Sequence, residues 1–575
     1  MNPEEIISRR IRQARGEEEA DLVIKKAAVF YLSSGELRRG DIAVCGDTIV
    51  GVDDSYHGKI EFDASGLTAV PGFIDSHVHI ESTCLTPWEY ERAVLPHGVT
   101  SAVCDPHELA NVAGAEALKY FSDCASGMIM DLRIRFSSCV PASPWESPGA
   151  RLSAESLRSA AGLPHLEGLA EVMDFPGVLA CKEDLLDKLS AFSGSIIDGH
   201  CPMLSGKDLN AYLSSGISTC HETDSLDEAF EKLRKGMGIL IREGSTGRNL
   251  DTLAPLITIE NSPFLAFCTD DRSLQDILEK GHIDYMIRRA IALGADPLAV
   301  YRAASFSAGP LCGLSGRGLI APGYKADIVL LSYLDKCDVR HVFKNGRPVE
   351  ESLFSGRTAE PDASHFHHSV HSRLFSPADF RILSKTARTH VIGLLPGSLI
   401  TEHLQMDLPR SGSGEKTADP DQDLAKAAVV ERHGGRNHHA LGFVRGTGLK
   451  SGAVASSIGH DSHNLCVCGV DDEDMALALN CVIEMQGGFA VAAHGRILSS
   501  LPLPVGGLMT GLPFMRLAEE LRRIRQALRS LRAADDAPDL FQQLSFLPLT
   551  VIPHLKLSDQ GLVDVDQWKL LYEES

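Results

Sequence analysis

Short runs of alternating apolar and polar residues occur at both flanks of a long middle region. The first run begins near residue 21, and the second contains Asn345-Gly346, a favoured dipeptide for a tight hairpin turn. Side chains of a strand point alternately to its two faces, so these runs predict short antiparallel strands with one buried face. We therefore expect residues 1–70 and 316–355 to combine into one small composite β domain.

The middle region, residues 71–315, alternates between apolar runs that end in polar residues and stretches of helical periodicity. Eight such runs occur, at residues 73–79, 101–107, 132–139, 168–173, 195–200, 216–221, 238–244 and 264–271. Strand-then-helix units repeated in this way are what a (β/α)8 barrel of the TIM type requires. An open doubly wound sheet is the alternative, but no glycine-rich phosphate-binding fingerprint follows the first run. The sequence predicts an α/β fold built on such a barrel.

The composition changes again after the second flank. Residues 356–425 are rich in Ser, His, Pro and Asp, and residues 409–424 indicate an exposed loop, so we expect a linker here. Residues 426–575 are expected to form an additional C-terminal α+β domain. One of its helices is predicted from apolar residues that recur at intervals of three and four, namely Leu517, Leu521, Ile524, Leu528 and Leu531.

Charge and cysteine content narrow the class of partner. The formal net charge of −22 argues against nucleic acid or an anionic membrane, because phosphate binding needs clustered Lys and Arg. The 14 cysteines are scattered and include no CxxC pair, which favours reduced thiols over a disulfide framework. No long apolar run predicts a membrane span. We expect a cytoplasmic protein that binds a small molecule and forms a homo-oligomer.

Polar residues with metal-ligand chemistry end several of the predicted strands. His77 and His79 lie two residues apart and so face the same side of the first strand. A histidine in a core is often only structural, but four later strand ends carry further ligand types, at Glu171, His200, His221 and Asp270. A barrel gathers these ends at one mouth, where active sites of this fold lie. The pattern predicts a site for one or two divalent ions.

Longer segments around these positions resemble a known family. The stretches "PGFIDSHVHIEST", "VLPHGVTSAVCDPHELANVAG", "DGHCPMLSGKDLNAYLSSG", "REGSTGRNL", "SSIGHDSHNLCVCGVDDEDM" and "LPLPVGGLM" are similar to the adenine deaminase family of the amidohydrolase superfamily. The resemblance covers nearly the whole chain. It implies that His77, His79 and Asp270 bind one ion, that His200 and His221 bind a second, and that Glu171 bridges them. It favours manganese or iron, whereas ligand softness alone admits zinc as well.

The reaction implied by this resemblance is hydrolytic deamination of adenine to hypoxanthine and ammonia, a step of purine salvage and adenine catabolism. A metal-activated hydroxide would attack C6, and Asp270 would carry a proton from the water to the departing amine. Glu108 and His107 are candidates for the group that protonates a ring nitrogen. The alternative is that this segment only begins the next helix, with Asp105 as its cap.

Two further segments are candidates for contact with the purine base. Ser245, Arg248 and Asn249 follow the seventh strand and carry groups that can hydrogen-bond a purine edge, although Ser and Asn also start helices. His463 belongs to the segment "GHDSHN", which we expect either to close the pocket, to bind a further ion, or to be a plain polar turn.

Two alternative functions remain at this stage. The first is a different amidohydrolase that acts on a cyclic amide or another aminopurine, since one metal centre serves many substrates. The second is a non-catalytic metal-binding scaffold, whose mark would be a missing ligand, and every ligand position is filled here.

Overall fold

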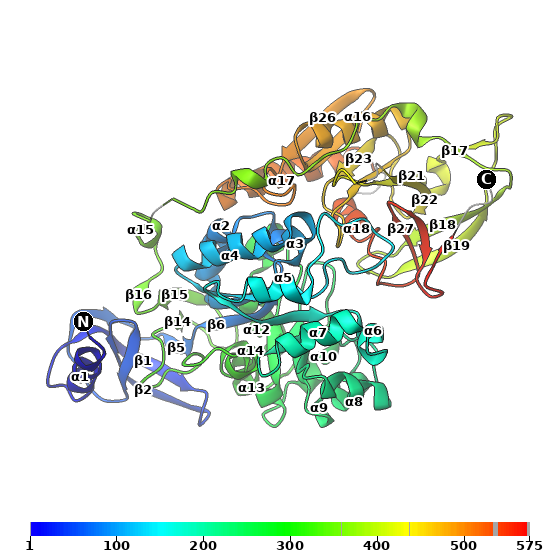
Figure 1. Ribbon diagram of the computed structural model, residues 1–575. Coiled ribbons are helices and arrows are strands. Elements are labelled where there is room, and N and C mark those ends of the chain that lie inside the picture. The colour runs from blue at the N-terminus through cyan, green and yellow to red at the C-terminus, as the bar shows by residue number, and fades with distance from the viewer. Residues whose placement is uncertain (1, 358, 436–437, 533–538, 572–575) are drawn as a thin grey trace.

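The computed structural model describes residues 2–357, 359–435, 438–532 and 539–571 (Figure 1). After helix α1 (Pro3–Ala14), the first sheet combines strands from both flanks of the middle region. Its strands are β1 (Ala20–Tyr31), β2 (Glu36–Cys45), β3 (Thr48–Val52), β4 (Gly58–Asp63), β5 (Thr68–Pro71), β14 (Ile328–Leu331), β15 (Val339–Lys344) and β16 (Arg347–Pro348). Their order is β16-β15-β14-β5-β1-β2-β3, with β4 also paired to β1. Antiparallel pairing of β14 with β5 joins the two flanks.

The middle region is a mixed α/β structure of parallel strands, each followed by one or more helices. One sheet has the order β10-β9-β8-β7-β6 and a second has the order β11-β12-β13. The strands are β6 (Phe73–Val78), β7 (Val99–Cys104), β8 (Asp131–Phe136), β9 (Leu166–Val172), β10 (Ile197–Gly199), β11 (Thr219–Cys220), β12 (Gly238–Arg242) and β13 (Leu265–Cys268). Each of the eight predicted runs therefore overlaps a strand, although β10 and β11 are much shorter than their runs.

Helices of the middle region follow the strands in chain order. They are α2 (Pro87–Val94), α3 (His107–Ala113), α4 (Ala115–Gly127), α5 (Ala154–Ser159), α6 (Phe175–Leu179), α7 (Glu183–Ala191), α8 (Gly206–Ser214), α9 (Leu226–Arg234), α10 (Leu250–Leu253), α11 (Leu274–Lys280), α12 (Ile283–Ala292), α13 (Pro297–Tyr301) and α14 (Ala308–Cys312). Several of these helices begin after a residue whose side chain caps the first turn. In α11, for example, the hydroxyl of Ser273 accepts a hydrogen bond from the Asp276 amide.

The two parallel sheets approach each other at both of their edges. At one edge the Asp270 amide donates to the His77 carbonyl at 2.9 Å, and the His79 amide donates to the Asp270 carbonyl at 3.3 Å. At the other, the Ser218 amide donates to the Ile197 carbonyl at 3.0 Å. The carboxyl ends of strands from both sheets therefore lie around one common region.

The C-terminal part is built on an eight-stranded sheet with the order β19-β18-β22-β21-β24-β23-β25-β26. Its strands are β18 (Arg388–Leu394), β19 (Thr401–Asp407), β21 (Leu424–Val430), β22 (His439–Arg445), β23 (Ala453–Ser456), β24 (Leu465–Gly469), β25 (Gly488–Ala493) and β26 (Arg496–Pro502). Helices α16 (Asp472–Glu484), α17 (Phe514–Arg529) and α18 (Leu540–Ser545) and the small sheet of β27 (Leu555–Ser558), β28 (Gly561–Asp564) and β29 (Lys569–Leu571) complete it. The buried face of α17 contains Leu517, Leu521, Ile524 and Leu528, as predicted, and Leu531 is buried just beyond the helix end.

The segment expected to be a linker, residues 356–425, differs from that expectation. Strands β18 and β19 lie within it, and β18 pairs in parallel with β22 of the C-terminal sheet. In the expected loop, β20 (Glu415–Lys416) pairs with β17 (Ile382–Leu383). Strand β19 was missed because it is an edge strand whose side chains are mostly polar and partly exposed, so its apolar pattern is weak.

The C-terminal part lies over the middle region, on the side away from the first sheet (Figure 1). The Phe514 amide donates to Glu89 of α2 at 2.9 Å, and the Thr510 amide donates to the Cys84 carbonyl at 2.9 Å. Among the described helices, none combines the length and the apolar composition needed to span a lipid bilayer.

Candidate metal centre and active site

The end of β6 brings two imidazoles into one buried region. All residues of β6 are buried, and Asp75 anchors the strand against β13 by accepting from the amide of Thr269 at 3.0 Å and from its hydroxyl. His77 and His79 point to the same side, with their Nε2 atoms 3.1 Å apart. The Nδ1 atom of His79 lies 2.9 Å from the Asp105 carbonyl, which orients the ring so that Nε2 faces the cavity.

Glu171, at the end of β9, lies at the centre of the histidine cluster. Its Oε1 atom is 3.4 Å from Nε2 of His79 and 3.7 Å from Nε2 of His77. Its Oε2 atom is 2.9 Å from Nδ1 of His200 and 3.3 Å from Nε2 of His221. The two oxygens of one carboxylate thus face two different pairs of imidazoles, which is the geometry expected of a bridging ligand.

Asp270 closes the same cluster from the end of β13. Its Oδ1 atom is 3.1 Å from Nε2 of His79 and 3.5 Å from Nε2 of His77. Its Oδ2 atom accepts from Nη1 of Arg242 at 2.8 Å. The same guanidinium also pairs with both carboxylate oxygens of Glu222. The carboxylate of Asp270 is therefore held between a histidine pair and a buried arginine.

Arg242 and Glu222 were not singled out in the sequence, although the same strand-end argument covers both. Arg242 is the last residue of β12, and Glu222 directly follows His221. Burial disfavours the charge on Arg242, but the carboxylates of Glu222 and Asp270 outweigh it and raise the pKa of the guanidinium. Arg242 therefore provides a fixed positive charge at the edge of the cavity, and Glu222 provides a negative charge that compensates it.

The donor set fits divalent metal ions. Three overlapping groups have ligand atoms within 4.8 Å of one another, namely His77, His79 and Glu171; His77, His221 and Asp270; and Glu171, His200 and His221. Imidazole and carboxylate donors in tight clusters are typical of Mn, Fe and Zn sites. Burial opposes ionisation of Glu171, yet hydrogen bonds from His200, His221 and His79 hold its pKa well below the usual range. A buried carboxylate kept ionised is suited to bind cations.

His107 and Glu108, at the start of α3, take different positions. His107 stacks on His79 with centroids 4.2 Å apart, and its Nδ1 atom is 3.5 Å from Oε1 of Glu171. Glu108 lies behind it, where its Oε1 atom is 3.3 Å from Nδ1 of His460 and accepts from the Ser82 hydroxyl at 3.4 Å. Burial, the largest cause, and nearby Asp271 raise the pKa of Glu108 well above its usual value. A neutral carboxylic acid here can donate a proton.

His463 reaches the same acid from the C-terminal part of the chain. Its Nε2 atom is 3.6 Å from Oε2 of Glu108, while its Nδ1 atom accepts from the Gly459 amide at 3.3 Å. Both His460 and His463 are buried. The "GHDSHN" segment therefore closes over the middle region, although only His460 and Asp461 of it line the cavity beside the metal ligands.

The three candidates for contact with the purine base, namely Ser245, Arg248 and Asn249, do not line the cavity at the metal ligands. Ser245 and Arg248 line an open groove farther out. Asn249 is buried and accepts from the Arg242 amide at 2.7 Å, while its side-chain amide donates to the carbonyls of His221 at 3.1 Å and Thr223 at 3.0 Å. Asn249 thus braces the backbone behind two site residues instead of offering its polar groups to a ligand.

The cavity at the metal ligands has a volume of about 40 Å³, and the C-terminal part forms one side of it. The residues that cover it from there are Leu399, His460, Asp461, Phe546, Leu549, Val551 and Ile552. Apolar side chains therefore form a wall beside the polar cluster. Sequence patterns alone gave no sign of this cover, because its residues come from separate segments that meet only through packing.

Comparison with known proteins agrees with this architecture. Residues 68–349 match the amidohydrolase family, and residues 398–569 match the adenine deaminase C-terminal domain. "Adenine deaminase" of Methylobacterium nodulans is 52% identical over 98% of this chain and 99% of that relative. "Adenine deaminase" of Cereibacter sphaeroides is 52% identical over 98% of both chains. "Adenine deaminase 1" of Agrobacterium fabrum is 50% identical over 98% of this chain and 97% of that one.

The solved structures that match this chain are less similar to it than these relatives are. A β-aspartyl dipeptidase from Fervidobacterium islandicum AW-1 has a TM-score of 0.42 and 17% identity, and the match covers 57% of this chain and 96% of that one. The full-length relatives and the two matched families together are decisive. The chain belongs to the adenine deaminase family of amidohydrolases.

Proposed function

We propose that this protein hydrolyses adenine to hypoxanthine and ammonia. The observation that carries the proposal is that the two carboxylate oxygens of Glu171 face two separate pairs of imidazoles. The chain that carries this cluster is 52% identical to relatives named adenine deaminase. Such a cluster suits activation of water, and the C-terminal match distinguishes this chain from amidohydrolases in general.

The metal centre is proposed to hold two divalent ions. His77, His79 and Asp270 would bind one, and His200 and His221 would bind the other, with Glu171 between them. Ions held in this way supply Lewis acidity and lower the pKa of a shared water towards neutrality. We propose manganese as the resident metal, with iron or zinc as the alternatives that the same donors accept.

Asp270 is proposed as the proton carrier of the reaction. Its Oδ1 atom faces the imidazoles of His77 and His79, where the attacking water would lie, and its Oδ2 atom is fixed by Arg242 at 2.8 Å. A carboxylate held in this orientation can accept a proton from water and then donate it to the departing amine. The guanidinium prevents rotation of the carboxylate between these two events.

A second proton is needed where charge develops on the ring, and we propose Glu108 as its source, with His107 as the alternative. Glu108 hydrogen-bonds Ser82 and lies 3.3 Å from His460, and both of these side chains line a cavity between the middle region and the C-terminal part. We infer that the proton moves through one of them. His107 is closer to the metal ligands and lines their cavity directly.

We propose that residues 71–315 form a closed (β/α)8 barrel, supported by the backbone hydrogen bonds between the edges of the two parallel sheets. The division into residues 1–70 with 316–355, the segment 356–425 and residues 426–575 is proposed with β18 and β19 assigned to the C-terminal domain. A cytoplasmic homo-oligomer active in purine salvage and adenine catabolism completes the proposal.

The test uses protein stripped of metal by a chelator and then reloaded with manganese. Ammonia release and the ultraviolet change from adenine to hypoxanthine are measured before and after reloading. Activity that appears only after reloading supports substrate, reaction and metal together. Inactivity with two metal equivalents bound would reject adenine and lead to a panel of cyclic amides and other aminopurines.

A variant sharpens this test. Asp270→Asn keeps the size of the side chain but removes the group that accepts a proton, so turnover should fall at least about a hundredfold. Asp251→Asn, at an exposed ion pair with Arg289, is the matched control and should keep full turnover. Equal activity of Asp270→Asn and the control would contradict the role of Asp270.

A further inference from the structure

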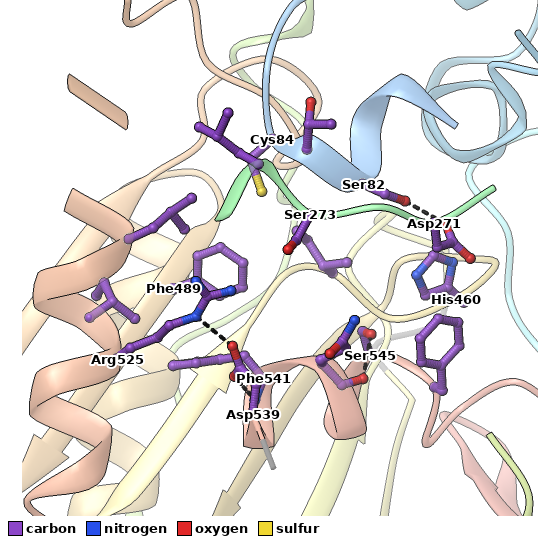
Figure 2. Close-up of a pocket in the computed structure, with 17 residues that line it drawn as sticks. Ser82, Cys84, Asp271, Ser273, His460, Phe489, Arg525, Asp539, Phe541 and Ser545 are labelled. Atoms are coloured by element: carbon purple, nitrogen blue, oxygen red, sulfur yellow. Dashed lines mark hydrogen bonds and ion pairs between the residues drawn. The ribbon is translucent and has the colours of Figure 1, made fainter. Parts of the chain in front are cut away.

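A second cavity lies beside the metal cavity, between the middle region and the C-terminal part (Figure 2). We call it the aromatic chamber, since Phe489, Phe541 and Phe546 form much of its wall. Asp271, His460 and Phe546 line both the aromatic chamber and the metal cavity, so the two spaces are neighbours.

The aromatic chamber is larger than the metal cavity. The metal cavity measures about 40 Å³ and the aromatic chamber about 100 Å³. The aromatic chamber is therefore the larger of the two spaces, and we infer that it takes the larger part of a bicyclic ring system while the metal cavity takes its reacting edge.

The wall of the chamber has the chemistry that a flat aromatic ligand requires. Phe489 and Phe541 meet edge to face with centroids 4.9 Å apart. Phe546 is stacked on the imidazole of His460 with centroids 4.5 Å apart and an interplanar angle of 6°. Nucleic-acid bases stack on such side chains regardless of their hydrogen-bonding edge. Aliphatic side chains of Leu274, Ile458, Leu521 and Ile524 complete the apolar surface.

The charged groups of the chamber lie at its two ends, and Ser273 and Ser545 lie between them together with the apolar side chains (Figure 2). At the inner end the Ser82 hydroxyl donates to Asp271 at 2.5 Å, next to His460 (Figure 2). At the outer end Nε of Arg525 donates to Asp539 at 2.6 Å. A base in this space would therefore stack in the middle and hydrogen-bond at its inner edge.

The outer end leads towards solvent. Ser273, Arg525, Asp539 and Gln542 line both the chamber and the open groove where Ser245 and Arg248 lie. The groove, the aromatic chamber and the metal cavity therefore follow one another from the surface inwards. A ligand bound in the chamber would have a path from solvent on one side and the metal ligands on the other.

We propose that the aromatic chamber binds the bicyclic ring of the purine base and directs its amino-bearing edge into the metal cavity. This inference rests on the proposed function for the identity of the base. Phe541 and Phe546 would contact the ring faces, and Ser82 and His460 would hydrogen-bond its inner edge. The chamber, not the segment after β12, then determines that a planar heteroaromatic substrate is accepted.

The first test fills the chamber. Ser545 is a buried residue at the end of α18 that lines the chamber, and its hydroxyl donates to the Gln542 carbonyl three residues back at 2.8 Å. Ser545→Leu adds bulk to the chamber while the metal ligands stay intact. Ser530→Leu is the matched control, because Ser530 also ends a helix and donates to the carbonyl three residues back, yet lies exposed outside the chamber.

Binding is measured with 2-aminopurine, a fluorescent isomer of adenine without the amino group at C6, by fluorescence anisotropy on the metal-loaded protein. Adenine turnover and metal content are measured in parallel. We expect binding to the wild type and to Ser530→Leu, and at least tenfold weaker binding together with at least tenfold lower kcat/KM in Ser545→Leu at unchanged metal content. Undiminished binding in a folded Ser545→Leu variant, or no binding to the wild type, overturns the proposal.

A second variant covers the case in which Ser545→Leu does not fold. Phe541→Leu keeps an apolar side chain but removes the aromatic face, and we expect about tenfold weaker 2-aminopurine binding from the lost stacking. Unchanged binding there overturns the proposal as well. Saturable 2-aminopurine binding that these variants weaken, without adenine turnover by the wild type, would reject the proposed reaction and leave the chamber as a purine site.

Discussion

Nη1 of Arg242 lies 2.8 Å from Oδ2 of Asp270, while Oδ1 of the same carboxylate faces the imidazoles of His77 and His79. Both residues are buried, and the only other carboxylate that this guanidinium contacts among the described residues is Glu222. The guanidinium of Arg242 thus orients Asp270, the proposed proton carrier. It also offsets the charges of Glu222 and Asp270, which follow the two strands that flank β12.

Arg242→Met should destabilise the fold because it leaves two buried carboxylates without their cation. We expect a loss of about 3–5 kcal/mol in the free energy of unfolding, measured by urea denaturation. Adding Glu222→Gln should recover part of that loss, since one uncompensated charge is then removed. Arg133→Met, which removes partly exposed pairs with Glu167 and Asp131, is the control and should cost at most about 1 kcal/mol, because Asp131 keeps its pair with Arg317. Equal effects of Arg242→Met and Arg133→Met would show that the buried contact is unimportant.

Glu171→Gln should weaken the metal pair while the fold remains. The amide keeps one oxygen but cannot present two anionic oxygens to the two pairs of histidines, so metal content should fall from two equivalents per chain to one or fewer. Inductively coupled plasma mass spectrometry after dialysis measures the metal content, and circular dichroism checks the fold. Glu167→Gln, at the exposed beginning of the same strand, is the control. Two retained equivalents in Glu171→Gln would contradict a bridging role.

Lys232→Met should lower stability because Lys232 is a fully buried cation with several acceptors. Its Nζ atom donates to the carbonyls of Cys201 and Glu222 at 3.0 Å each, and to Glu228 at 2.7 Å. Cys201 and Glu222 directly follow His200 and His221, so the same contacts brace two proposed ligands. We expect a loss of about 3–5 kcal/mol and weaker metal retention.

Lys235→Met provides the comparison for that variant. Lys235 follows the same helix and pairs with Glu231 at 2.7 Å, but it is only half-buried, so its loss should cost at most about 1 kcal/mol. Thermal unfolding and metal analysis on both variants make the measurement. A Lys235→Met variant as unstable as Lys232→Met would point to the helix end instead of the buried ammonium.

Stability should depend on pH through Lys556. Burial lowers the pKa of Lys556 to about 7 from its usual 10.5, and its ammonium lies within hydrogen-bonding distance of the Leu399 and Phe546 carbonyls. Between these pH values the unfolded chain binds a proton that the folded chain does not, so folding stability rises as the pH rises through this window. As the pH falls from about 10.5 to about 7, the wild type should lose up to about 5 kcal/mol from this source.

Lys556→Met should lack this contribution to the pH dependence. The difference in unfolding free energy between variant and wild type should therefore shift in favour of the variant as the pH is lowered from 10 to 7. Lys569→Met, an exposed position on β29 of the same small sheet, is the control and should follow the wild type. A constant difference between Lys556→Met and the wild type across this range would contradict the depressed pKa.

Local sequence was sufficient to locate the strands of the middle region and the proposed metal ligands. His77, His79, Glu171, His200, His221 and Asp270 each lie at or just beyond a strand end, so the period of two and the position in the run identify them. Parallel strands share one direction, and their carboxyl ends therefore meet. No knowledge of distant contacts was needed for that step.

Tertiary structure decided the features that depend on contacts between distant segments. Strand β18 is recognised by its pairing with β22, and the polar-rich edge strand β19 by its pairing with β18. Ser245 and Arg248 were candidates by residue type, yet the turn after β12 places them on the outer groove. The cover of the cavity, with Phe546 and His460, is formed where separate C-terminal segments pack over the strand ends.

The physical reason for this division is the range of the forces involved. Backbone geometry and the burial of alternate side chains act over a few residues, so the sequence by itself determined which polar groups stand at the strand ends. Which apolar surfaces cover those groups, and how large a space they leave, follows from packing between segments that are hundreds of residues apart, such as those of Phe546 and His107. Only the folded chain fixes that.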